Sequence, residues 1–166
     1  MVGVKSGFCV GVSLALVMLL ASWLDVQPAT PENYITDLVL LLGMAVTDYR
    51  YRRTLPDGRV TLKELMLLGV WTGFVCAVVY GLLLWLYGVL DGALVARFVE
   101  QRLSMMPAAD GDTQAALNIQ LVQHYSAGDW GFIGGFRIAV MSILMNLVSA
   151  LLFRTEKAPV RERKKR

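Results

Sequence analysis

Four stretches of the chain are long and apolar enough to form transmembrane helices, and no other feature constrains the fold more. They cover approximately residues 7–24, 34–49, 65–90 and 131–153. A helix needs about 20 mostly apolar residues to cross the hydrocarbon core of a bilayer. The third stretch contains no charged residue, whereas the second is the shortest and includes both Asp37 and Asp48. The sequence therefore predicts an all-α fold, an integral membrane four-helix bundle.

The composition supports the same class of protein. Charged residues make up 17% of the chain, whereas a soluble domain is nearer to about a quarter charged. Cys9 and Cys76 both lie inside apolar stretches, which is typical of small packing residues and indicates neither a disulfide framework nor a zinc site. No set of residues has the spacing of a catalytic, metal or nucleotide site, so we expect no cofactor and no enzymatic activity.

The first stretch follows Lys5, so a cleaved signal peptide is an alternative to a transmembrane helix. The stretch ends in Leu20-Ala21-Ser22-Trp23, which contains no clean small-x-small cleavage site. We therefore expect this segment to be retained as the first transmembrane helix.

The basic residues fall almost entirely on alternate connections between the predicted spans. With the N-terminus in the cytoplasm, 13 of the 16 lysines and arginines are cytoplasmic, in the N-terminal segment, the second connection and the C-terminal tail. Cytoplasmic segments of membrane proteins carry such an excess of basic residues. Four spans also require both termini on one side of the membrane. We therefore expect a multi-pass protein with cytoplasmic N- and C-termini.

Residues 91–130, between the third and fourth stretches, are polar enough to lie outside the hydrocarbon. Apolar residues recur there at helical spacing in two segments, separated by a break from Pro107 to Asp112. We expect an extracytoplasmic amphipathic helical hairpin that lies on the outer membrane surface or caps the bundle. Residues 1–153 then form the membrane domain, and residues 154–166 form a basic cytoplasmic tail.

The connection between the second and third stretches contains two local signals. The segment Leu55-Pro56-Asp57-Gly58 is typical of a tight turn, because proline fixes φ and glycine tolerates a positive φ. Thr61 and Glu64 have the spacing of a capping box. We therefore expect a turn followed by a helix that begins after Thr61.

The segment from Tyr51 to Glu64, YRRTLPDGRVTLKE, resembles the stretch between spans two and three in a family of small bacterial membrane proteins, the domain of unknown function 4199. The family pattern is Tyr-Arg, a glycine and then Ile/Val-Ser/Thr-aromatic; Leu62 stands at the aromatic position, and Pro56 replaces a more flexible turn. The overall plan, with three spans, a helical segment rich in Met and Gln and a last span, is also similar. The resemblance implies a location in the bacterial cytoplasmic (inner) membrane, and it implies no activity.

Small residues recur every four positions on two of the predicted helices. Residues four apart share one helix face, and small residues allow two backbones to approach closely. This pattern favours packing inside one four-helix bundle, with a dimer interface as the alternative. The predicted helix-packing residues are Gly69, Gly73, Ala77 and Gly81 on the third span, and Gly3, Gly7 and Gly11 at the start of the first.

Arg137 is the one strong charge in the fourth predicted span. It lies about 9 Å along the helix from Gly131, at 1.5 Å per residue, and a charge at that depth is unfavourable unless it is paired or reaches the interface. Asp37 and Asp91 are both expected near the same leaflet, and Asp37 is the preferred partner. The alternatives are a snorkelling arginine and a substrate or proton site.

The remaining polar groups are assigned to structural roles. Asn146, with Ser142 and Ser149, forms a polar stripe expected to hydrogen bond between helices. Asp48 is expected among the headgroups, where it balances nearby arginines. The basic tail is expected to bind anionic lipid headgroups and, having no stacking aromatic residue, does not predict nucleic-acid binding. The predicted headgroup ligands are Arg161, Arg163, Lys164, Lys165 and Arg166.

Three classes of function remain open. The favoured class is a non-enzymatic accessory or scaffold subunit of an envelope assembly, which would contact lipids and other membrane proteins or further copies of itself. The second is a small oligomeric transporter or channel, for which Asp37, Arg137 and Asn146 are the only candidates for a polar pathway. The third is a lipid-active membrane enzyme, which needs carboxylates, His or Cys to converge at an interface. No such set can be assembled from the sequence.

Overall fold

A computed structural model of the protein describes residues 2–24, 34–104, 106 and 113–155, and all regular secondary structure in these residues is helical. The all-α prediction is therefore confirmed. The helices are α1 (Val2–Trp23), α2 (Tyr34–Thr54), α3 (Leu62–Leu90), α4 (Gly92–Ser104), α5 (Thr113–Gln123) and α6 (Ala127–Phe153).

Three helices in the described residues are long and apolar enough to cross a membrane. They are α1 over Val2–Ala21, and α3 and α6 over their whole lengths. Helix α2 is not among them, because Asp37, Asp48 and Arg50 interrupt its apolar sequence. Three apolar helices of this length support a membrane protein, whereas the additional span predicted at residues 34–49 stays a prediction.

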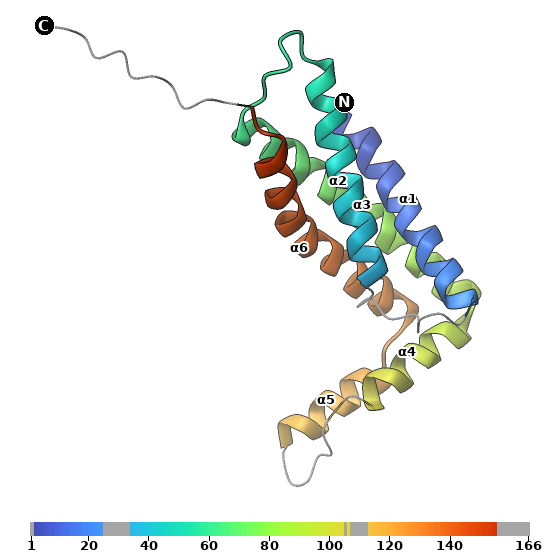
Figure 1. Ribbon diagram of the computed structural model, residues 1–166. Coiled ribbons are helices and arrows are strands. Elements are labelled where there is room, and N and C mark those ends of the chain that lie inside the picture. The colour runs from blue at the N-terminus through green and yellow to red at the C-terminus, as the bar shows by residue number, and fades with distance from the viewer. Residues whose placement is uncertain (1, 25–33, 105, 107–112, 156–166) are drawn as a thin grey trace, which may run out of the picture.

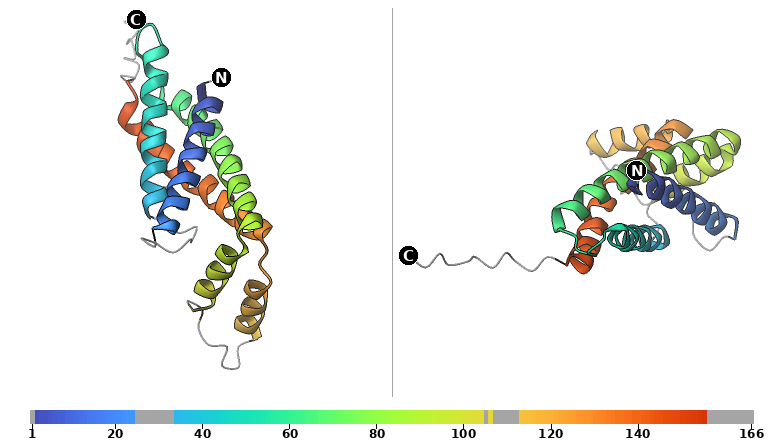
Figure 2. Two further views of the ribbon diagram at one scale, coloured as in Figure 1. Left: turned by 90° about the vertical axis from the view of Figure 1, so that its right-hand side faces the viewer. Right: turned by 90° about the horizontal axis from the view of Figure 1, so that it is seen from above.

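Helices α1, α2, α3 and α6 lie side by side, and α4 and α5 extend beyond one end of this group (Figures 1 and 2). Helix α3 is central, because it packs along both α6 and α1, while α2 packs mainly along α6 and α1. The start of α1 and the end of α6 lie at the end of the molecule opposite α4 and α5 (Figure 1). Helix α4 contacts α5, α3 and α6; that α4 and α5 form an extracytoplasmic hairpin stays a prediction.

The start of α3 follows the local signals in the sequence. The Thr61 hydroxyl accepts a hydrogen bond from the Glu64 N–H, and the Glu64 carboxylate accepts one from the Thr61 N–H at 2.9 Å. In the preceding turn, Gly58 has a φ of 57° and its N–H donates to the Leu55 carbonyl at 3.1 Å. Both the capping box and the turn are confirmed. A second capping box, at Ser126 and Asp129, begins α6.

The side chains divide into a buried core and an apolar outer surface. The largest fully buried side chains are Trp130, Tyr80, Leu14, Met18, Leu40, Met44, Leu65, Leu84, Ile138 and Val60. On the outer faces of the long helices, large apolar side chains remain exposed, such as Phe132 at 73% and Phe136 at 62%. Soluble monomers rarely expose contiguous apolar surfaces of this kind. The outer surface therefore suits a lipid environment.

Candidate functional site

The polar contacts of the protein lie along the seams where its long helices pack. At one end of the α2–α6 seam, Arg137 Nη2 donates to Asp37 Oδ2 at 2.6 Å, and Nη1 donates to the Thr36 hydroxyl at 3.4 Å. The Arg137 and Asp37 side chains are 20% and 16% exposed. Of the two acids considered as partners of Arg137, the structure brings Asp37 to it. Arg137 is therefore paired rather than only reaching toward the interface.

The other end of the α2–α6 seam carries a second carboxyl, which the sequence analysis assigned to the headgroups. That assignment is wrong: Asp48 is 1% exposed and accepts a hydrogen bond from the Ser149 hydroxyl, which is fully buried. The physical reason is helix phase, because Asp48 lies four residues from Met44 and eight from Leu40, on the same buried face of α2. This spacing of four is the signal that could have found it.

Two of the arginines near Asp48 have other partners. The Arg52 Nε–H donates to the Gly58 carbonyl at 3.1 Å, and the Arg53 guanidinium lies over the Tyr49 ring, 5.2 Å from its centroid.

Because Asp37 pairs with Arg137 and Asp48 with Ser149, α2 and α6 run parallel to each other.

The seam between α3 and α6 is built from glycines facing polar side chains. The Asn146 amide lies against Gly69 and donates to the Met66 carbonyl at 3.1 Å, and Ser142 lies against Gly73. A Cβ at Gly73 would lie 2.6 Å from the Ser142 Cβ, closer than van der Waals contact allows. Asn146 is fully buried, and its Oδ1 has no hydrogen-bond partner in the described residues. Both polar side chains therefore fill the space that the glycines leave.

Further along the same seam, the two backbones touch. A Cβ at Gly81 would lie 2.9 Å from the Gly131 carbonyl oxygen, and a Cβ at Gly135 would lie 3.0 Å from the Ala77 carbonyl oxygen. Gly69 thus pairs with the later part of α6 and Gly81 with its start, so α3 and α6 are antiparallel. Only small residues permit this approach.

The predicted small face of α1 packs in the same way against α3. A Cβ at Gly7 would lie 2.5 Å from the Thr72 carbonyl oxygen, and one at Gly11 would lie 2.9 Å from the Cys76 carbonyl oxygen. Gly3 meets the preceding turn of α3, at Leu68. The order of these contacts makes α1 parallel to α3. In this structure the small faces of α1 and α3 are therefore occupied by helices of the same chain.

Asp91, the other acid considered as a partner of Arg137, lies apart from these seams. Asp91 is half-buried, and its Oδ1 accepts a hydrogen bond from the Ala93 N–H at 3.1 Å, at the start of α4. It therefore has a helix-capping role instead of a contact with Arg137. The predicted headgroup ligands of the tail, from Arg161 to Arg166, lie outside the described residues.

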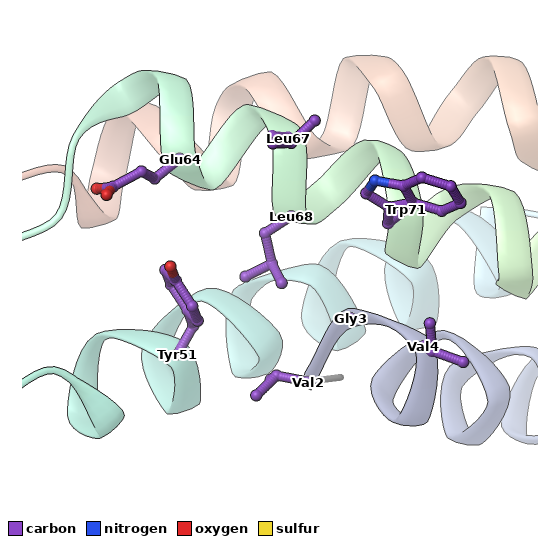
Figure 3. Close-up of a pocket in the computed structure, with 8 residues that line it drawn as sticks. All are labelled: Val2, Gly3, Val4, Tyr51, Glu64, Leu67, Leu68 and Trp71. Atoms are coloured by element: carbon purple, nitrogen blue, oxygen red, sulfur yellow. The ribbon is translucent and has the colours of Figure 1, made fainter.

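Open grooves run along the outside of the described helices, among them two of similar volume. The first, of about 450 Å³, lies between the start of α1, the end of α2 and the start of α3, with Leu67, Leu68 and Trp71 on one side (Figure 3). Its polar residues, Tyr51 and Glu64, lie toward one end, and Glu64 is held by the capping box at the start of α3. The chemistry of this groove suits an apolar chain with a polar group at one end.

The second groove, of about 440 Å³, follows the outer side of the α3–α6 seam. The close crossing at Gly81 and Gly131 forms its floor, and Phe74 and Phe132 are among its walls. The lining is apolar along its length, so this groove suits a lipid chain or an apolar helix. The described residues contain no group of three His, Cys, Asp or Glu side chains that could hold a metal ion.

A family model with the description "Protein of unknown function (DUF4199)" matches residues 5–155, which is most of the chain. No curated protein matches the chain. No solved structure matches it either.

Proposed function

The chain belongs to the DUF4199 family, and from this premise we propose that it is a non-enzymatic accessory or scaffold subunit of an assembly in the bacterial cell envelope. The main observation in support of the proposal is that buried polar side chains fill the contact between two helices. Ser142 and Asn146 fill the α3–α6 seam and contact glycines and a backbone carbonyl. Side chains used in this way stabilise helix packing and are not free to bind a passing solute.

In this proposal, α1, α2, α3 and α6 form a four-helix membrane bundle in the cytoplasmic membrane. Both termini are cytoplasmic, because 13 of the 16 basic residues then lie on that side. Helices α4 and α5 form a hairpin outside the cytoplasm. The exposed apolar faces contact lipid and the helices of partner proteins, and the basic tail contacts anionic headgroups at the cytoplasmic face.

The proposal is tested by the assembly state of the tagged chain, extracted from native membranes in a mild detergent and run on a blue-native gel. A scaffold subunit is expected to migrate in an assembly larger than a detergent-bound monomer. Gly73→Leu is expected to abolish that assembly, because a bulky side chain separates α3 from α6. Asn146→Leu is expected to retain it, because leucine is similar in size to the asparagine that it replaces. Migration of the wild type as a monomer contradicts the proposal.

The second candidate is a small oligomeric transporter or channel, and the α2–α6 seam is the observation that favours it. This seam carries the Arg137–Asp37 pair at one end and the buried Asp48 at the other. Ionisable residues inside membrane segments often mark ion pathways. On this alternative, Asn146→Leu yields a folded protein that has lost its transport activity, whereas the scaffold proposal expects Asn146→Leu to retain its function.

A further inference from the structure

Asp48 and Asp37 are carboxyls on one helix in opposite electrostatic situations. Asp37 lies 2.6 Å from the Arg137 guanidinium, whereas Asp48 is buried against a neutral group, the Ser149 hydroxyl. In the described residues, no cation lies within ion-pair distance of Asp48. The partner that compensates the negative charge of Asp37 is therefore missing at Asp48.

The elements packed against this end of α2 supply no such partner. On α2 itself, Arg52 and Arg53 are engaged with the Gly58 carbonyl and the Tyr49 ring. On α6, the group that contacts Asp48 is the neutral Ser149 hydroxyl. The other charged side chains that the structure describes at this end are exposed: Lys5 of α1, Arg50 of α2, Asp57 and Arg59 in the connection that follows, Lys63 and Glu64 of α3, and Arg154 after α6.

An ionised carboxylate is unstable in such a place. Burying one ion is unfavourable even after the protein relaxes. One hydroxyl donor offsets only a part of that cost, because a single hydrogen bond does not replace the hydration of a carboxylate. A proton removes the charge without needing additional space. The neutral carboxyl keeps the hydrogen bond to Ser149 and has no uncompensated charge.

We propose that Asp48 and Ser149 form a proton-binding site that holds α2 against α6 while the proton is bound and releases that end of α2 when the proton leaves. In this step the carboxyl O–H bond breaks, the proton passes to water, and the resulting carboxylate must be hydrated. Water can reach it only if α2 and α6 separate around Asp48.

The Arg137–Asp37 pair confines this movement to one end of the helix. Asp37 lies eleven residues from Asp48, which is about 16 Å along α2 at 1.5 Å per residue. The ion pair and its hydrogen bond to Thr36 do not depend on the Asp48 proton. Helix α2 therefore pivots at its Asp37 end and opens at its Asp48 end. The pivot makes the cytoplasmic end of the α2–α6 seam responsive to pH.

The first test is the thermal midpoint of the purified full chain in detergent at about pH 5 and about pH 8. The carboxyl of an unfolded aspartate is ionised above about pH 4. If the folded state keeps the Asp48 proton, it binds more protons than the unfolded state across this range, and stability falls as pH rises. The wild type should therefore melt a few degrees lower at about pH 8 than at about pH 5.

The matched variant is Asp48→Asn, which has the same shape and cannot ionise. It should remove the part of the pH dependence due to Asp48 and melt at or above the wild type at about pH 8. Ser149→Ala, which keeps the carboxyl, should melt lower than the wild type at both pH values and retain the pH dependence. Because each comparison is between variants of one chain, pH effects that the compared proteins share cancel. Equal pH dependence in the wild type and Asp48→Asn overturns the proposal.

Two further measurements keep the proposal testable if Asp48→Asn folds poorly. In the wild type, infrared spectra at about pH 5 should contain the carbonyl band of a buried protonated carboxyl, and this band should weaken toward about pH 8. Hydrogen exchange should show the Asp48 end of α2 opening more often at about pH 8, after correction for the intrinsic rate, with no change at the Asp37 end. Absence of the carbonyl band shows an ionised Asp48 and overturns the proposal. Equal opening at both ends overturns the pivot.

Discussion

Arg137 and Asp37 form a contact between residues one hundred positions apart, and each compensates the charge of the other. Their side chains are mostly buried, and the second oxygen of Asp37 has no hydrogen-bond partner in the described residues. The carboxylate therefore depends on the guanidinium more than a surface acid would. Removal of one member leaves a charge in a poorly hydrated position.

Arg137→Leu is expected to destabilise the protein by roughly 2–4 kcal/mol, because it leaves Asp37 unpaired. Adding Asp37→Asn should recover part of that loss, because it removes the unpaired charge, so the double variant should melt above the single one. Thermal melting of the three proteins in detergent measures both differences. If Arg137→Leu melts like the wild type, the arginine contributes nothing through the pair.

The two acids of α2 also show what sequence can predict at this scale. Arg137 is the one strong charge of its span, so few partners were possible and Asp37 could be named. Asp48 was misplaced because its neighbours in sequence are arginines, whereas its burial depends on the phase it shares with Leu40 and Met44. The contact with Ser149 also depends on how α2 and α6 are aligned, and no single helix encodes that alignment.

At the scale of elements, α3 packs against two helices through two different faces. Gly69 and Gly73 face α6, while Thr72 and Cys76 present their carbonyl oxygens to the glycines of α1. The spacing of four predicted that these faces pack closely. It could not predict which helix covers each face, because a small residue accepts any backbone. An interface with a second copy was therefore an alternative interpretation of the same glycines.

Gly73→Ala is expected to destabilise the protein by about 1–3 kcal/mol, the usual effect of overpacking a tight contact. The added Cβ would overlap the Ser142 side chain. A second change, Ser142→Gly, should restore much of the loss by clearing that space. The matched control is Gly92→Ala on α4, where an added Cβ meets no atom within 4 Å. Thermal melting of the wild type and these three variants distinguishes close packing from a general effect of losing a glycine.

At the scale of the whole molecule, the length of the apolar segments predicted the three helices in the described residues that are long and apolar enough to cross a membrane. Whether α2 crosses a membrane could not be predicted in the same way, because charged residues interrupt its apolar sequence. Its contacts with α6 cannot be inferred from its own hydropathy. The arrangement of α1 parallel to α3, and of α2 parallel to α6, follows from these contacts. The proposed orientation rests only on the distribution of lysines and arginines along the sequence.

Cysteine labelling tests that orientation. In a chain with Cys9 and Cys76 replaced by alanine, Gln120→Cys on α5 should react with a membrane-impermeant maleimide in intact cells. Arg59→Cys, in the connection between α2 and α3, should react only after the membrane is permeabilised. Both positions are exposed, so a difference in labelling reports the side of the membrane. Reaction of Arg59→Cys in intact cells contradicts the proposed topology.

The contacts of α2 have a consequence for how the protein is made. Asp37 and Asp48 meet their partners only on α6, at least one hundred residues later in the chain. At a synthesis rate of about 5–20 residues per second, α6 leaves the ribosome roughly 5–20 s after α2. During that interval α2 carries two acids whose insertion into lipid costs up to about 2.5–3.5 kcal/mol each. We expect α2 to wait at the membrane surface until α6 is available, so that the order of insertion differs from the order of translation.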